Sequence, residues 1–318
     1  MTAAPMRVLR DDDTLPASPG SAVTIGVYDG VHRGHQWLLR RLRQTSGDAL
    51  PVVVVTFHPH PLQVLRPVAA PRLLTDLDLK LRLLSASGAV DACLVVSFDT
   101  DRQMQSAEDF VADVLVNQLH ARHVLVGTDF RFGHDRQGDL ELLRDLGSAS
   151  GFRADGLPLL PVRPSTAHIA CSSTYIRGLV AAGDVQAAAR LLGRPHEVAG
   201  AVVGTSQPIG RGTPTVVVRV DAYRALPTEG SYAGWLITQD GRRHTAGVSV
   251  RQGITAREQA LLDVHVVDGV SPRIHEAVRV ELTRRVWTSD RGDLVAEMAT
   301  QAEQFAQAWA VGGWGSAS

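Results

Sequence analysis

An alternation of apolar runs with amphipathic helical segments most restricts the fold of this chain. The apolar, β-branched runs that predict buried strands lie at residues 22–27, 52–57, 92–98 and 123–127. Segments with the apolar spacing of helices lie between them, at residues 35–43, 77–84 and 107–119. Strands that alternate with helices predict an α/β fold with a parallel sheet. Ligands of such sheets bind beyond the carboxyl ends of the strands.

The second part of the chain has a different rhythm. A helical stretch at 174–192, with an expected break near Gly183 and Asp184, is followed by Gly193 and Pro195, which mark a domain boundary. Short strands separated by turns follow at residues 198–203, 215–220, 232–237, 245–250, 262–267 and 277–282. Successive strands without helices between them predict a small six-stranded antiparallel β-barrel. We expect a helix at 294–309 to follow the barrel.

The length of 318 residues exceeds that of one typical domain. Hydrophobic residues make up 44% and charged residues 20%, so a sizeable core can form. The formal net charge of -1 provides no global basic field for nucleic acid. We expect a polar lead-in at 1–20, an α/β domain at 21–193, a barrel domain at 194–311 and a flexible tail at 312–318.

The cysteine content and the first residues of the sequence indicate the cellular compartment. Cys93 and Cys171 are the two cysteines, and they form neither a CxxC pair nor a disulfide framework. The first residues lack a basic region followed by an apolar run, so we expect no signal peptide. No stretch has the roughly 20 apolar residues that a membrane span needs. These features predict a cytoplasmic protein that binds no membrane and no nucleic acid.

The strongest chemical signal is the segment from Gly26 to His35, which reads GVYDGVHRGH. It follows a predicted strand and opens a predicted helix. Glycines let the backbone approach a phosphate closely, and the amides of a helix N-terminus favour anions. Two histidines three residues apart can bond phosphate oxygens from one side of the first turn. Solvated histidines beside an ordinary turn are the alternative. The candidate phosphate-binding residues are Gly26, Tyr28, Asp29, Gly30, His32, Gly34 and His35.

Two further blocks carry polar residues at the ends of predicted elements. Asp129, Phe130 and Arg131 combine charge with an aromatic ring, which suits an aromatic ligand bearing a phosphate, although a structural ion pair is an alternative. Ser172, Ser173, Thr174 and Arg177 stand at a helix start, where hydroxyls either only cap the helix or also bind phosphate. A zinc site formed by His32, His35, His58 and His60 is disfavoured, because the prolines stiffen that turn and no cysteine joins it.

Five ordered blocks resemble the bacterial bifunctional riboflavin kinase/FMN adenylyltransferase family, the prokaryotic FAD synthetases. The HxGH segment at 32–35 is similar to the signature of the nucleotidyltransferase superfamily. The blocks TFHPHP, LT…K with Lys80, VGTDFRFG and SSTYIR are similar to further family segments, and the resemblance spans roughly residues 20 to 310. His58 departs from the usual acidic residue, and Tyr28 from the commonest residue at its position.

The resemblance implies a Rossmann-like nucleotidyltransferase domain that makes FAD from ATP and FMN, with Mg²⁺ bound along with the ATP phosphates. His32, His35 and Arg177 would be catalytic. Gly26, Tyr28, Asp29, Gly30, Gly34, Ser172, Ser173 and Thr174 would bind ATP phosphates. Phe57, His60, Asp129, Phe130 and Arg131 would form the flavin or nucleotide pocket.

The second domain resembles the riboflavin kinase barrel of the family, with departures at its site. Pro214 and Thr215 match the family's GFPTAN signature, but its asparagine is replaced by Val217, which offers no oxygen to a cation. The family's catalytic glutamate corresponds to Asp263, which has a shorter reach. An ångström-scale misplacement can cost about 100-fold in rate. We therefore expect a degenerate kinase site.

Four functional interpretations remain open at this point. The first is an FAD synthetase with weak or lost riboflavin kinase activity. The others are a fully bifunctional enzyme, a nucleotidyltransferase with another flavin or phosphate acceptor, and a non-catalytic flavin- or nucleotide-binding regulator. The expected partners are the small molecules ATP, FMN and, for a competent barrel, riboflavin.

Overall fold

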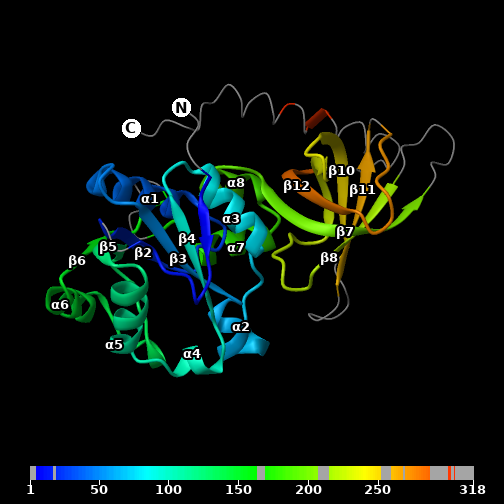
Figure 1. Ribbon diagram of the computed structural model, residues 1–318. Coiled ribbons are helices and arrows are strands. Elements are labelled where there is room, and N and C mark those ends of the chain that lie inside the picture. The colour runs from blue at the N-terminus through cyan, green and yellow to red at the C-terminus, as the bar shows by residue number, and fades with distance from the viewer. Residues whose placement is uncertain are drawn as a thin grey trace. The chain divides into compact units, whose positions relative to one another are not determined.

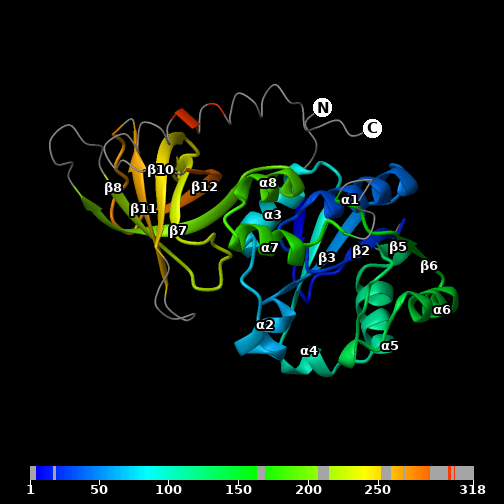
Figure 2. The same ribbon diagram turned by 180° about the vertical axis from the view of Figure 1, so that it is seen from behind.

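The computed structural model describes residues 5–16, 19–162, 169–206, 215–251, 259–267, 269–286, 300, 301 and 304. These residues form two compact units, which can be followed from two sides in Figures 1 and 2. The first comprises residues 1–71 and 77–171, and the second comprises residues 72–76 and 172–318. The expected helix at 294–309 and the tail at 312–318 lie outside the described residues, apart from three residues in helical conformation.

The described part of the first unit contains a parallel six-stranded sheet with the order β1-β4-β3-β2-β5-β6. Its strands are β1 (Arg7–Leu9), β2 (Ser21–Ile25), β3 (Val52–His58), β4 (Ala92–Ser97), β5 (Ala121–Gly127) and β6 (Arg153–Leu157). Its helices are α1 (Arg33–Ser46), α2 (Pro61–Leu65), η1 (Pro67–Ala69), α3 (Leu77–Ala86), α4 (Thr100–Met104), α5 (Ala107–Phe110), η2 (Val111–Gln118), η3 (His134–Arg136) and α6 (Leu140–Ser150). The predicted α/β class is confirmed.

Helices cover both faces of this sheet because the central strands are apolar on both sides. On one face Val53 and Val55 pack against residues of α5, η2 and α6. On the other face Val54 packs with Leu39 of α1 and Leu84 of α3. The segment predicted as one helix at 107–119 is an α-helical turn, α5, that continues in π-type turns as η2.

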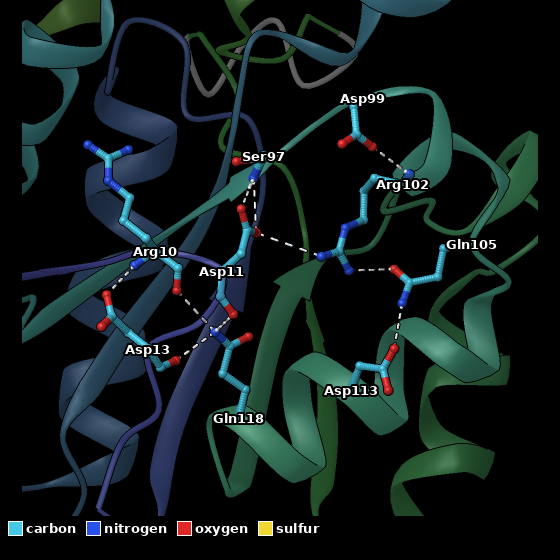
Figure 3. Close-up of polar contacts among 9 residues, drawn as sticks. All are labelled: Arg10, Asp11, Asp13, Ser97, Asp99, Arg102, Gln105, Asp113 and Gln118. Atoms are coloured by element: carbon cyan, nitrogen blue, oxygen red, sulfur yellow. Dashed lines mark hydrogen bonds and ion pairs between the residues drawn. The ribbon is translucent and has the colours of Figure 1, made fainter.

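The N-terminal segment contains a strand where the sequence predicted only a polar lead-in. β1 pairs in parallel with β4, and Leu9 is buried. Gln118 holds the residues after β1, because its side-chain amide donates to the carbonyls of Arg10, Asp11 and Asp13 at 3.2, 2.9 and 2.7 Å (Figure 3). The Asp11 carboxylate in turn accepts from the Ser97 amide at the end of β4. This polar segment is therefore an ordered edge of the sheet.

The second unit contains a closed six-stranded barrel whose strand pairs are all antiparallel, as predicted. Alternate residues of each strand, such as Val216, Val218 and Val220, fill its interior. The strands are β7 (His196–Ser206), β8 (Thr215–Val220), β9 (Gly230–Ile237), β10 (Arg243–Arg251), β11 (Ala260–Val266) and β12 (Ala277–Val286).

Two helices precede the barrel, α7 (Ser173–Ala181) and α8 (Val185–Leu192). The expected break falls between them, where Gly183 has a positive φ and the Asp184 carboxylate caps α8. The sequence pattern predicts a boundary at 193, with this pair in the first domain. The contacts instead group the pair with the barrel, because Val185 belongs to the barrel core.

Residues 72–76 also belong to the second unit. The Leu73 amide donates to the Tyr223 carbonyl at 2.6 Å, and the Ala225 amide donates to the Leu73 carbonyl at 2.8 Å. The described helices include none that is both long enough and apolar enough to cross a bilayer.

Candidate active site

The sheet order brings three predicted site loops to neighbouring strand ends. β2 lies between β3 and β5, and all three strands run in parallel. The chain adds β3 and β4 on one side of β2 and then returns to add β5 and β6 on the other side. Such a reversal is a topological switch point, where open α/β sheets bind ligands at the carboxyl edge. The loops after β2, β3 and β5 therefore share this edge.

The loop between β2 and α1 has an unusual backbone. Tyr28, Gly30 and Val31 have φ angles of 53°, 83° and 38°. The Tyr28 ring is buried, and its hydroxyl shares a 2.8 Å hydrogen bond with that of Thr24. Burial raises the Tyr28 pKa above its usual range. The ring carbon of Tyr28 would lie 3.2 Å from a Cβ at position 26, so glycine there allows the ring under the loop.

The two histidines of the HxGH segment stack at the start of α1. The ring centroids of His32 and His35 are 3.7 Å apart, with an angle of 21° between the planes. His32 occupies the N-cap position, but its side chain makes no capping hydrogen bond, and the first turn contains no acidic residue. An N-terminus with these properties attracts an anion through its amide groups and the helix dipole.

His35 is held in the neutral form by its surroundings. Burial, followed by the nearby His32 and Lys80, keeps the His35 pKa well below its usual value. Among the described residues, Nδ1 of His35 is buried and has no hydrogen-bond partner. The ring lies between His32 and Tyr28, whose centroid is 4.7 Å away. A neutral imidazole can donate one hydrogen bond to a phosphate oxygen.

Thr56 of β3 and Lys80 of α3 stabilise this loop through hydrogen bonds. Lys80 is buried on α3, and its ammonium group donates to the Thr56 hydroxyl at 3.2 Å. The Thr56 hydroxyl donates to the carbonyl of Val27 at 3.0 Å. Lys80 and Thr56 both belong to blocks that resemble the family, but the sequence does not predict their contact, because it forms only when α3 packs on the sheet.

The loop after β5 carries the predicted flavin-pocket residues. Asp129 and Arg131 are exposed, and the Arg131 guanidinium donates to the carbonyl of Phe130 at 3.0 Å. The half-buried Phe130 ring stacks on that of Phe132 with a centroid distance of 5.3 Å. Phe132 packs in the core of the first unit. The loop therefore offers one partly open aromatic ring between two exposed charges.

Phe57, near the end of β3, and His60, in the loop that follows, have different surroundings. Phe57 is partly buried, and its ring meets the Phe98 ring edge-on at 5.9 Å. His60 caps α2, because its Nδ1 accepts from the Leu62 amide at 3.0 Å. His58, the departure from the family pattern, is exposed.

The SSTYIR block begins α7 in the second unit. The Ser172 hydroxyl caps the helix by accepting from the Tyr175 amide at 3.3 Å. The Arg177 guanidinium donates to the Thr174 hydroxyl at 3.1 Å, and Ser173 is half-buried. Capping by Ser172 is therefore present, and the hydroxyl and guanidinium groups of Thr174 and Arg177 lie together.

The described positions of the expected kinase site meet on the outer face of the barrel. The Thr215 hydroxyl shares a 2.9 Å hydrogen bond with Nδ1 of His265. Val217 pairs with Asp263 across β8 and β11. The Asp263 carboxylate accepts from the guanidinium of Arg251 at 2.6 Å. Burial lowers the His265 pKa, against the attraction of Asp263. Pro214 lies outside the described residues.

The described side chains form no ready-made metal site. Mg²⁺ commonly binds through nucleotide phosphates and one or two carboxylates. In the part of the chain that the structure describes, no group of three or more His, Cys, Asp or Glu side chains is arranged to hold a metal.

The first unit has a parallel sheet, and two stacked histidines lie at a helix N-terminus at its switch point. These features define an α/β domain of the nucleotidyltransferase type. The same chain also carries a closed barrel. The FAD synthetase profile matches residues 15–174, and the riboflavin kinase profile matches residues 192–309. The chain belongs to the family of bifunctional riboflavin kinase/FMN adenylyltransferases.

Two curated relatives with that name illustrate the similarity. The protein from Escherichia coli K12 is 33% identical over 304 residues, which cover 93% of this chain and 94% of the relative. The protein from Pseudomonas fluorescens is 36% identical over 259 residues, covering 80% of each chain. A solved structure described as a macrolide-efflux protein from Streptococcus pneumoniae shares the fold, with a TM-score of 0.73 and 24% identity over 96% of this chain and 99% of that one.

Proposed function

We propose that this chain is an FAD synthetase, which transfers AMP from ATP to FMN and releases pyrophosphate, and that its riboflavin kinase activity is weak or lost. The observation that carries the transferase is the stacked pair His32 and His35 at an uncapped helix N-terminus on the switch point. Membership of the bifunctional family supports the choice of ATP and FMN.

The chemistry requires little from side chains beyond position and charge. A phosphate oxygen of FMN attacks the α-phosphorus of ATP, the bond from that phosphorus to the bridging oxygen breaks, and pyrophosphate leaves with the electron pair. The attacking phosphate is already anionic, so no strong base and no covalent enzyme intermediate are needed. His32 and His35 would donate to the nucleotide phosphates, since donors aimed at developing charge stabilise the transition state.

The remaining candidate residues have supporting roles in this proposal. Gly26, Asp29, Gly30 and Gly34 would line the phosphate site, with Tyr28 beneath the loop. Phe57, His60, Asp129, Phe130 and Arg131 would bind the flavin or nucleotide ring. Arg177, Ser172, Ser173 and Thr174 would hold the leaving pyrophosphate. Mg²⁺ bound to the ATP phosphates would neutralise part of their charge.

Loss of kinase activity is supported by the outer face of the barrel. Val217 provides no oxygen ligand, and the Asp263 carboxylate is paired with Arg251. A fully bifunctional enzyme is the second candidate, because the barrel itself is complete in its six strands. The proposal also places the enzyme in the cytoplasm, supported by the buried free thiols of Cys93 and Cys171.

A paired assay tests the proposal. Purified protein and MgATP receive either FMN or riboflavin, and the flavins are separated by chromatography. We expect FAD from FMN and little or no FMN or FAD from riboflavin. FAD from both would establish the bifunctional enzyme. Pyrophosphate release only with another acceptor would identify a different transferase, and flavin binding without turnover would identify a regulator.

The H32A/H35A variant tests the site assignment. Each lost donor should lower kcat by about 10²–10³-fold, as for donors to other developing anions. The matched control is His275→Asn, because His275 is exposed in the second unit and its positive φ suits asparagine. An unchanged rate in the double variant, with wild-type melting, would remove the histidines from the mechanism.

A further inference from the structure

Cys171 lies against His32, the histidine of the HxGH segment at the N-cap position of α1. Its side chain is buried, and its Sγ is 3.7 Å from Nδ1 of His32, within hydrogen-bonding distance for sulfur. The Cys171 amide donates to the Leu160 carbonyl at 2.8 Å, which anchors the residue in the first unit. The contact joins residues that are 139 positions apart in the chain.

Gly34 completes this arrangement. Its backbone N–H forms a hydrogen bond to the thiol of Cys171. A Cβ at position 34 would lie 3.0 Å from the Cys171 carbonyl oxygen and 3.1 Å from Nδ1 of His32. The absence of a side chain at Gly34 therefore lets the thiol, the ring and the loop backbone approach one another.

The proton positions follow from the chemistry of the groups. Burial raises the Cys171 pKa, so the thiol keeps its hydrogen. The sulfur accepts from the Gly34 amide, and its own hydrogen has Nδ1 of His32 within reach. A neutral imidazole whose Nδ1 accepts a hydrogen bond carries its proton on Nε2. The other ring nitrogen of His32 then becomes the donor.

We propose that Cys171 is a positioning residue that fixes His32 in the Nε2–H tautomer and so presents a hydrogen-bond donor to a nucleotide phosphate. The identity of the acceptor rests on the proposed function, whereas the tautomer does not. A packing role alone is the competing explanation, because a buried cysteine also behaves as a small apolar residue.

Cys93 provides a matched control. It is the other cysteine of the chain, fully buried on β4, where it packs among apolar residues such as Val54 and Leu84. Cys93→Ala removes the same atoms as Cys171→Ala. A packing effect should appear in both variants, but an effect on His32 should appear only in Cys171→Ala. Cys171→Ser keeps a hydroxyl that can replace the thiol as a donor.

The experiment combines two measurements on the full chain. Nitrogen-15 NMR of the histidine side chains, without nucleotide, reports the His32 tautomer, and steady-state kinetics with MgATP and FMN report kcat and KM. We expect the Nε2–H form in the wild type and in Cys171→Ser, and a mixture of tautomers in Cys171→Ala. We expect kcat to fall about five- to tenfold in Cys171→Ala, the equivalent of one hydrogen bond, with KM for ATP nearly unchanged.

The result that would overturn the proposal is an unchanged His32 tautomer in Cys171→Ala. Equal loss of kcat in the alanine and serine variants would also overturn it, because the serine should restore the donor. If no variant and no wild-type enzyme makes FAD, the proposed function fails, and the NMR result still decides whether Cys171 sets the tautomer.

Discussion

Val217 and Asp263 are direct partners on the antiparallel strands β8 and β11, and both lie on the outer face of the barrel. Val217 stands where the kinase signature of the family has asparagine, and Asp263 stands where the family has its catalytic glutamate. Their pairing means that the missing oxygen ligand and the shortened carboxylate affect one place on the surface. These two departures are therefore neighbours in the fold, although they are 46 residues apart in sequence.

The V217N/D263E variant should gain riboflavin kinase activity. Asparagine supplies an oxygen for a hard cation, and glutamate restores the reach of the carboxylate. We expect riboflavin phosphorylation to rise by at least about 100-fold, the scale of an ångström-sized displacement at a reacting group. Chromatography of FMN formed from riboflavin measures it. FAD formation from FMN serves as the control and should not change; an equally inactive double variant would show that other residues limit the kinase.

Removal of Arg251 should have little effect on stability. Arg251 is 56% exposed, and its ion pair with Asp263 at 2.6 Å is therefore open to solvent and salt. Exposed pairs contribute roughly 0–1 kcal/mol. Urea unfolding of Arg251→Gln should give a free energy of unfolding within about 1 kcal/mol of the wild type. A larger loss would mean that this pair has a structural role in the barrel.

Mild acid should destabilise the protein partly through His35. The folded pKa of His35 is held well below its ordinary value, so between these two values the unfolded chain binds a proton that the native protein does not. The contribution is complete above the unfolded pKa of about 6.5 and is lost as pH falls below it, by at most about 1.4 kcal/mol per pH unit. His35→Gln should flatten the fall in unfolding free energy between about pH 6.5 and 5, measured by urea titration. A His35→Gln protein that keeps the wild-type slope would contradict this prediction.

The native thiols should react slowly. Burial raises the Cys93 pKa to about 12 against the opposing charges of Lys80 and Arg10, and it also raises the Cys171 pKa. Because the thiolate is the reactive form, both thiols should react with a disulfide reagent at pH 8 much more slowly than in the unfolded chain. In denaturant, both thiols should react at the rate of the unfolded chain. One thiol that reacts at the unfolded rate in native protein would contradict the burial of that residue.

Gln118 should be a stabilising residue of the N-terminal edge. Its side chain is largely buried and donates to three backbone carbonyls. Gln118→Leu keeps most of the volume but leaves those carbonyls without this donor, and we expect a loss of about 1–3 kcal/mol in unfolding free energy. The neighbouring Asn117 is exposed, so Asn117→Leu is the control for a generic helix effect. Equal melting of the two variants would argue against the prediction.

Local patterns in the sequence predicted most of the fold. The glycine-rich segment was placed correctly between β2 and α1, and the break at Gly183 and Asp184 separates α7 from α8. All six barrel strands were predicted because apolar residues alternate between turns. Helix α6 escaped prediction, and so did two strands of the sheet: β1 has three residues, and β6 reads RADGL. These segments become strands only because β4 and β5 offer them an open edge.

The contacts within the candidate site could not be read in the same way. The pairs His32 with Cys171 and Lys80 with Thr56 are distant in sequence and depend on how the elements pack. The capping role of Ser172 was predictable, because it needs only the local chain. Chemical groups were therefore identifiable from motifs, whereas their partners required the folded sheet.

The short segment at 72–76 also affects the order of assembly. It is synthesised long before Tyr223 and Ala225, the residues whose backbone it bonds. Its backbone bonds to the second unit can therefore form only after most of the chain has left the ribosome. A gene fragment that starts at residue 172 would encode the barrel without these partners. The two halves of this enzyme are thus interleaved along the gene, and exchanging one half between relatives would require transferring two separate pieces of sequence.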